Sequence, residues 1–457
     1  MKREQEQTNP NDNVSNMKLL LIQPAQMYPD EHLIRFTQSI SYPIGLVTLA
    51  ALTPPDIEIL IKNECVDDID LDADVDLVGI TGYTSQITRG YQLADAFRQR
   101  GVPVVMGGIH VSLNPTEAEQ HADAVVIGEA EGLWERVIED ARSQRLQQRY
   151  TLPAYPDLST PVIPRYDLVD RQKYISPPTV TSNLIPIQTA RGCPFRCDFC
   201  SVVQLLGRRF RTKPIPTVLK EIEACGSNYL FFSDDNLIGN LSHARELFKA
   251  ITPLNIKWMG QFPSTIGRHP ELIDLAAKSG CFLLFVGFET IIPESLREVG
   301  KSFNQRQNYS ELIHRILDAG ITPFGSFVFG FDHDTPDVFD QTLEFVERVN
   351  MPLISWFILT PLPGTVLYAR LFEEGRILDR RWQNYDLSHV VFQPAQMSPE
   401  ELQERYWQAF GAFYSRQNIV KRIRSATTDI TIQKMYAMLS RKMIAHHINP
   451  LSGGVLA

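Results

Sequence analysis

The chain has 457 residues, of which 44% are hydrophobic and 21% charged, and its formal net charge is -9. This length allows two or three domains with sizeable cores. The negative charge argues against general nucleic-acid binding, and no apolar run reaches the roughly 18 residues that suggest a membrane span. Residues 1–16 are polar and lack the apolar segment of a secretory signal. We therefore expect a disordered tail and a cytoplasmic protein with reduced cysteines.

Residues 17–143 alternate short apolar runs with segments of helical periodicity. We expect strands at Lys18–Gln23, Ile57–Ile61, Asp76–Thr81, Val102–Met106 and Ala124–Ile127. Helices are expected at Pro43–Leu52, at Ser85–Arg100 and from about Ala130. Continuously apolar strands are typical of buried parallel sheets. The alternation predicts a doubly wound α/β domain, a Rossmann-type fold whose ligands bind at the carboxyl ends of the strands.

Small and polar residues follow three of these strands. They are Tyr83, Thr84, Ser85, Gln86, Gly107, Gly108, Ile109, His110, Gly128, Glu129, Ala130 and Glu131. Small residues let a bulky ligand approach the backbone. No Gly-x-Gly-x-x-Gly motif occurs, which disfavours a nicotinamide or flavin dinucleotide. His110 either contacts the ligand or caps the next turn.

A Pro-rich segment, residues 144–184, separates this domain from a second α/β series. Its prolines are expected to break regular elements, and its tyrosines should pack it against the domains. The second series, residues 185–370, has expected strands at Ile185–Ala190, Asn228–Phe232, Asn255–Gly260, Phe282–Val286, Ile321–Phe329 and Leu353–Leu359. Six strand–helix units predict a partial (β/α)6 barrel with its site at the carboxyl-end face.

Three of the six cysteines lie within eight positions, at Cys193, Cys197 and Cys200. Thiolates this close together can bind a soft metal or an iron–sulfur cluster. A zinc site would need a fourth ligand nearby, and the remaining cysteines are scattered. A zinc knuckle and chance clustering are the alternatives to a cluster.

The stretch Arg191–Val203 closely resembles the cluster-binding motif of the radical S-adenosylmethionine (SAM) superfamily, including the aromatic Phe199 before the last cysteine. The resemblance implies a 4Fe–4S cluster on Cys193, Cys197 and Cys200, with one iron left open for SAM. Cleavage of SAM would give a 5′-deoxyadenosyl radical. An electron donor such as flavodoxin or ferredoxin is implied as a partner.

The same resemblance implies SAM contacts on the carboxyl-end face of the barrel. Asp234, Asp235 or Asn236 is placed where the family contacts the SAM amino group. Glu289 is placed where a polar group contacts the ribose or methionine end, and Gln261 lies on the same face. Helix capping is the alternative role for the two aspartates.

The N-terminal domain resembles the cobalamin-binding domain that precedes the barrel in one radical SAM subclass. The matching elements are Tyr42–Leu46, Val78–Thr81, Gly107–His110 and Gly128–Glu129. Cobalamin domains with a histidine ligand carry Asp-x-His-x-x-Gly, and here Arg35 replaces the glycine. His32 is therefore expected to be an ordinary loop residue. A domain that has lost its cofactor is the alternative.

Residues 371–457 are expected to form a helical region. Ser398 is the expected cap of a helix that starts with Pro399 and carries Glu401 in its first turn. Residues 416–447 hold seven Lys or Arg and one Asp. This basic segment is either a solvated helix face or a docking face for anionic lipid or a partner.

The resemblance, which includes Val391–Tyr414, extends to hopanoid methylases. It implies an enzyme that methylates an unactivated carbon of a small-molecule or lipid substrate. In that chemistry one SAM methylates cobalamin, and a second SAM supplies the radical. A radical cyclase, as in the magnesium-protoporphyrin ester cyclase, is the second enzyme class, and a non-catalytic cobalamin or iron–sulfur sensor is the third alternative.

Overall fold

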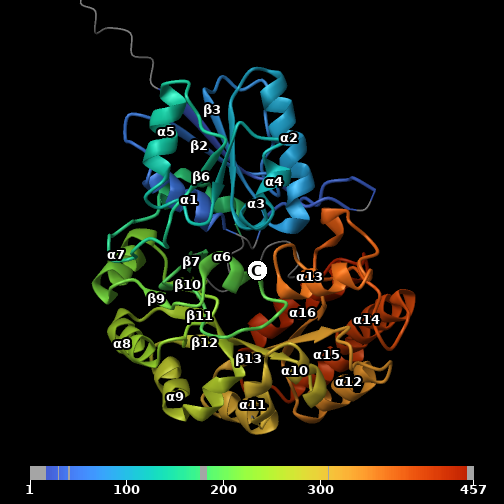
Figure 1. The fold of residues 1–457 in the computed structure, drawn as a ribbon. Coiled ribbons are helices and arrows are strands. Elements are labelled where there is room, and N and C mark those ends of the chain that lie inside the picture. The colour runs from blue at the N-terminus through green and yellow to red at the C-terminus, as the bar shows by residue number, and fades with distance from the viewer. Residues whose placement is uncertain (1–16, 29, 40–41, 175–182, 307, 450–457) are drawn as a thin grey trace, which may run out of the picture.

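The computed structural model describes residues 17–28, 30–39, 42–174, 183–306 and 308–449. It contains two six-stranded parallel sheets, with the first at the top of Figure 1 and the second below it. The tail expected at residues 1–16 lies outside the described residues. Among the helices of the described part, none has the length and apolarity needed to cross a bilayer.

The first sheet has the strand order β2-β1-β3-β4-β5-β6. Its strands are β1 (Lys18–Gln23), β2 (Glu58–Asn63), β3 (Leu77–Thr81), β4 (Val104–Gly107), β5 (Ala124–Ile127) and β6 (Arg149–Thr151). Its helices are α1 (Ile44–Ala51), α2 (Ile87–Gln99), α3 (Ile109–Leu113), α4 (Pro115–Ala118) and α5 (Trp134–Arg142). The doubly wound α/β prediction is confirmed.

Apolar cores cover both faces of this sheet. Because successive side chains of a strand point to opposite faces, Leu19 and Leu21 of β1 enter one core. Leu20 and Ile22 enter the other. Helices α1 and α5 complete the first core, and α2, α3 and α4 complete the second. The loops beyond the strands are therefore the first place to look for a ligand site.

One strand of this sheet was not expected from the sequence. β6 pairs with β5 in parallel, with Val125 opposite Arg149. The interpretation of residues 144–184 as free of regular elements is therefore wrong at β6. The first proline of the segment, Pro153, follows the strand and does not interrupt it. Tyr166 and Tyr174, further along, are buried in the barrel core, as expected for a segment packed against the domains.

The second sheet has the order β14-β13-β12-β11-β10-β7 and is parallel throughout. Its strands are β7 (Leu184–Ile187), β10 (Tyr229–Phe232), β11 (Lys257–Pro263), β12 (Cys281–Glu289), β13 (Thr322–Phe329) and β14 (Leu353–Ile358). Its helices are α6 (Ser201–Leu206), α7 (Ile215–Cys225), α8 (Leu241–Ile251), α9 (Pro270–Lys278), α10 (Pro293–Glu298), α11 (Tyr309–Asp318) and α12 (Val338–Arg348). The partial six-stranded barrel is confirmed.

The C-terminal region packs helices beside the last barrel strands (Figure 1). They are α13 (Val366–Glu373), α14 (Pro399–Phe413), α15 (Arg416–Arg424) and α16 (Ile430–Ile444). Ser398 caps α14 by accepting a hydrogen bond from the Glu401 N–H at 3.1 Å, as expected. The Tyr406 hydroxyl of α14 donates to the Trp356 carbonyl of β14 at 2.9 Å, which anchors this layer.

Candidate active site

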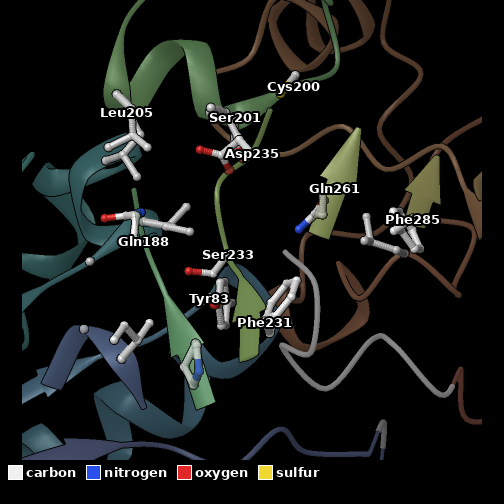
Figure 2. A pocket seen from close by; sticks show the side chains of 18 of the residues that line it. Tyr83, Gln188, Cys200, Ser201, Leu205, Phe231, Ser233, Asp235, Gln261 and Phe285 are labelled. Carbon is white, nitrogen blue, oxygen red and sulfur yellow. The ribbon is translucent and has the colours of Figure 1, made fainter. Parts of the chain in front are cut away.

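The carboxyl ends of the two sheets face each other across one cavity of about 980 Å³. The predicted site residues that line it are Tyr83, Thr84, Ser85, Gly107, Gly108, Gly128, Glu129, Cys193, Cys197, Phe199, Cys200, Asp235, Asn236, Gln261 and Glu289. Gln86, His110 and Asp234 are absent from this lining. Figure 2 shows Cys200, Asp235 and Gln261 around the same opening.

The cysteine loop leaves the carboxyl end of β7 and is closed by two short strands, β8 (Ala190–Arg191) and β9 (Arg211–Thr212). Gly192 has a φ of 89°, and a Cβ there would lie 2.6 Å from the Arg209 carbonyl oxygen. Only glycine fits this turn. Burial raises the pKa of Cys197 to about 11 and that of Cys200 to about 12. These thiols therefore stay protonated until a metal displaces the proton.

The three thiols fit an iron–sulfur cluster better than a single ion. No group of three or more His, Cys, Asp or Glu side chains in the described residues has the geometry for one metal ion. The thiolates of a four-iron cluster bind separate irons, so their sulfur atoms do not converge on one point. Cys193, Cys197 and Cys200 all line the cavity. The zinc-knuckle alternative gains no support from this geometry.

Glu289 ends β12 next to an irregularity in the pairing with β13. Its φ of 66° lies in the left-handed region, which is uncommon for a residue other than glycine. Its carboxylate pairs with the ammonium of Lys301, and the two side chains are 10% and 8% exposed. Burial acts to lower the pKa of Lys301, but Glu289 and Cys197 outweigh it and the pKa is raised. A charged lysine therefore lines the cavity beside the thiols, and the sequence analysis missed it.

The neighbouring aspartates of the loop after β10 have different surroundings. Asp234 accepts hydrogen bonds from the Thr189 N–H at 3.1 Å and from the Thr189 hydroxyl at 3.0 Å, which ties this loop to the end of β7. Asp235 lines the cavity instead. Burial raises the pKa of Asp234 to about 7 and that of Asp235 to about 6. The capping alternative is wrong, because Asn240 caps the next helix, α8.

Charged side chains join the two sheets at the edge of the cavity. Arg191, just before the cysteine loop, donates to Glu129 at 2.5 Å and to Glu131 at 2.6 Å. Arg211 pairs with the same Glu129 carboxylate. The Glu129, Arg191 and Arg211 side chains are 4%, 12% and 9% exposed. The Glu129 carboxylate, predicted as a cofactor contact, is thus held between two arginines of the barrel.

On the first-sheet side, glycines hold the backbone close to the cavity. Gly108 has a φ of 91°, and a Cβ there would overlap the Thr81 hydroxyl. Gly128 has a φ of 83°, and a Cβ there would meet no atom within 4 Å. The backbone is therefore open to a bulky ligand at Gly128, whereas Gly108 lets the chain pass close to Thr81. This cradle fits the close approach that a large cofactor such as cobalamin requires.

His110 and Gln86 lie behind this cradle. The His110 Nδ1 lies 3.3 Å from the Thr84 hydroxyl, and its ring packs edge-on against Trp382. Burial lowers the pKa of His110 to about 3, so the ring is neutral. Gln86 accepts a hydrogen bond from the Tyr83 N–H at 3.1 Å. In this structure both side chains support residues that line the cavity.

His32 lies apart from the cavity, as expected for a loop residue. Its side chain is 81% exposed, and its Nδ1 lies 3.2 Å from Asp30. Arg35, which replaces the motif glycine, pairs with Asp68 at 2.6 Å. His32 is therefore an exposed residue of a loop outside the cavity.

The chain matches three known domain families. The Radical SAM superfamily matches residues 187–346, and the B12 binding domain matches residues 37–138. A domain of unknown function (DUF4070) matches residues 365–452. Among solved structures, the radical SAM methyltransferase TsrM from Kitasatospora setae superposes with a TM-score of 0.61 at 19% identity, covering 86% of this chain and 85% of that one. That likeness shows a shared fold.

Two curated relatives are methyltransferases. The hopanoid C-2 methylase of Rhodopseudomonas palustris is 28% identical over 362 residues, which cover 75% of this chain and 67% of that protein. The bacteriochlorophyllide d C-8(2)-methyltransferase of Chlorobaculum tepidum is 30% identical over 433 residues, which cover 90% of this chain and 96% of that protein. The chain therefore belongs to the cobalamin-dependent radical SAM methyltransferases, enzymes that use a 4Fe–4S cluster, SAM and cobalamin.

Proposed function

We propose that this enzyme methylates an unactivated carbon of a small molecule held between its two sheets. The observation that carries the proposal is the single cavity, with three thiols on one side and open glycine turns on the other. When bound, the cluster, SAM and cobalamin supply an adenosyl radical and a transferable methyl group. The protein must then hold one substrate carbon between these two sources.

We assign the cluster to Cys193, Cys197 and Cys200. The amino and carboxylate groups of SAM carry opposite charges, and the cavity offers both complements near the thiols. Asp235 is the proposed partner of the ammonium, and Lys301 is the proposed partner of the carboxylate. Both side chains line the cavity, where the surrounding protein strengthens ionic hydrogen bonds.

The first sheet would hold cobalamin mainly through its backbone and short side chains. Gly107, Gly108 and Gly128 allow a close approach, and Thr84 and Ser85 add hydroxyl groups that line the cavity. Because His32 lies outside the cavity, we propose that no protein histidine at this position binds the cobalt. We therefore expect His32→Ala to leave the visible spectrum of bound hydroxocobalamin unchanged.

Two partners complete the proposal. SAM cleavage needs one electron, so we propose a small flavin or iron–sulfur protein such as flavodoxin or ferredoxin as its donor. The basic segment 416–447 is the proposed contact with an anionic membrane surface. Val420, Ile430 and Met438 support this contact because they expose 41%, 40% and 71% of their surface beside the basic residues. Sedimentation with phosphatidylserine vesicles tests it, since binding should weaken as salt rises.

The test of the proposed reaction is one anaerobic incubation with SAM, reductant and hydroxocobalamin. Methylation requires both S-adenosylhomocysteine and 5′-deoxyadenosine as products. A radical cyclase, the second candidate, needs to form only 5′-deoxyadenosine. Reconstituted protein that makes 5′-deoxyadenosine but neither binds cobalamin nor makes S-adenosylhomocysteine would contradict methyl transfer.

A further inference from the structure

The barrel strands line the cavity along much of their length as well as at their carboxyl ends. In β12, alternate residues Leu283, Phe285, Gly287 and Glu289 all line it. Alternation is expected because every second side chain of a strand shares one face. At about 3.3 Å per residue, the six steps from Leu283 to Glu289 span roughly 20 Å. The cavity therefore extends into the barrel along the strands, and we call this part of it the channel.

The channel changes from polar to apolar along this length. Lining residues within the first three positions of the barrel strands are all apolar, among them Leu184, Phe231, Met259, Phe282, Leu283, Phe324 and Leu353. Polar residues line the channel two or four positions after some of these apolar residues, in the same strands or in the loops that follow them. They are Gln188, Ser233, Asp235 and Gln261. Figure 2 shows this change along one segment, from Phe231 through Ser233 to Asp235 near the cysteine loop.

All charged residues in the cavity lining lie on the cysteine-loop side. They are Glu129, Glu131, Arg191, Asp235, Glu289, Lys301 and Asp386. Asp386 belongs to the same end, because the Gln26 amide from the loop after β1 donates to it at 3.2 Å. The amino-terminal half of the channel thus offers no charged partner to a ligand among the described residues.

Helix α16 supplies the remaining wall of this apolar half. Ile432, Met435, Tyr436 and Leu439 line the channel, at the spacing of a single helix face. The Tyr436 ring packs edge-on against Phe324 of β13 with centroids 4.8 Å apart. Met438, on the same helix, is 71% exposed. One face of α16 therefore belongs to the channel and another to solvent.

We infer that the amino-terminal half of the channel binds the body of an elongated hydrophobic substrate. Its reacting carbon would lie at the polar end, beside the cysteine loop. A polar molecule would lose its hydrogen bonds with water in this half, whereas an apolar one gains by leaving water. The inference rests on the proposed function, because it places the substrate of that reaction in the same cavity.

The test is binding of dansyl-aminoundecanoate, a fluorescent probe with a hydrocarbon chain, to the reconstituted enzyme. The wild type should bind it at one saturable site, and tetradecanol should compete. Met435→Asp should weaken probe binding at least about tenfold, because it places a charge in the apolar half. Leu378→Asp adds the same charge on a side chain that is 55% exposed and outside the cavity lining, and it should leave the affinity unaltered. Iron content and circular dichroism verify folding.

Leu439→Trp is a second variant that keeps the wall apolar but fills the channel, and it should also weaken probe binding. Equal affinities in the wild type, Met435→Asp and Leu439→Trp would overturn the inference. Wild-type enzyme that forms both SAM products but does not bind the probe contradicts this inference alone. Wild-type protein that binds the probe but does not bind cobalamin contradicts the proposed function alone.

Discussion

The two sheets have the same parallel construction but present different surfaces to the cavity. Apolar cores cover both faces of the first sheet. The cavity reaches its strand-end loops and also Gly79 of β3, Val105 of β4 and Leu49 of α1. The barrel sheet packs one face on its helices (Figure 1). Its other face lines the cavity along the strands. The first sheet therefore offers its strand ends and one side of α1, whereas the barrel offers the inner face of its strands.

This difference separates the chemistry of the two regions. The thiols, Asp235 and Lys301 come from the barrel side, and the open glycine turns come from the first sheet. Glu129 joins the two sides through Arg191 and Arg211. Each region can therefore be altered by substitutions that leave the other unchanged.

The largest effect should come from the cysteine loop. Replacing Cys193, Cys197 or Cys200 with Ala should abolish both the reconstituted cluster and 5′-deoxyadenosine formation, since the cluster needs its thiolates. Cys65→Ala, a buried thiol outside the cavity, should retain iron and activity. Formation of 5′-deoxyadenosine by any of the first three variants would refute the assignment.

The second-largest effect should come from breaking the ionic contact between the sheets. Glu129→Gln removes the charge but keeps the shape, and two arginines remain buried beside it. Breaking a buried pair costs about 3–5 kcal/mol, so the melting temperature should fall clearly. Glu271→Gln breaks the exposed pair with Arg245 and should cost at most about 1 kcal/mol. Equal losses in the two variants would mean that the contact does not hold the sheets together.

A smaller effect is expected from filling the first-sheet cradle. Gly107 lines the cavity without a left-handed φ, and a Cβ there meets only ordinary contacts. Gly107→Phe should weaken hydroxocobalamin binding about 100-fold, or about 2.7 kcal/mol. Gly411→Phe, in α14 outside the cavity, is the control.

Gly108→Leu should also block cobalamin binding, but the result would be harder to interpret. Its positive φ and the overlap of a Cβ with Thr81 would strain the backbone as well. If Gly107→Phe bound hydroxocobalamin with unchanged affinity, the first sheet would not form the cobalamin site.

The smallest effect is expected at the proposed SAM carboxylate partner. Lys301→Met should leave the iron content intact but weaken SAM binding by about 1.5–3 kcal/mol, the range for a hydrogen bond to a charged group. Glu289→Ala should weaken SAM binding by a similar amount, partly because Lys301 then lacks its own partner. Calorimetry with SAM on the anaerobic protein gives both values. Unaltered affinity for SAM would mean that other residues make these contacts.

The sequence predicts the features that depend on neighbouring residues. The strand positions follow from local apolar runs, and the cysteine spacing is itself the cluster motif. The sequence could not distinguish Asp234 from Asp235, because the difference depends on Thr189, which lies in the loop between β7 and β8. It missed β6, which needs the edge of β5 for pairing. It also missed Lys301, whose role comes only from its contact with Glu289.

Contacts between residues far apart in the chain could not be predicted from the sequence for the same reason. Glu129 follows its strand as predicted, but the arginines that hold it belong to the other sheet. Nothing in the periodicity of α16 shows which structure its apolar face covers. The channel wall appears only when β7 and β10–β14 are assembled around that helix.

The central claim is that the cluster and cobalamin share one cavity. Electron paramagnetic resonance of protein loaded with the reduced cluster and cob(II)alamin tests it most directly. Each paramagnetic centre should broaden the signal of the other and speed its relaxation. The cobalamin signal should return to its unperturbed shape in Cys200→Ala, which lacks the cluster. Two unperturbed signals from doubly loaded protein would contradict the shared cavity.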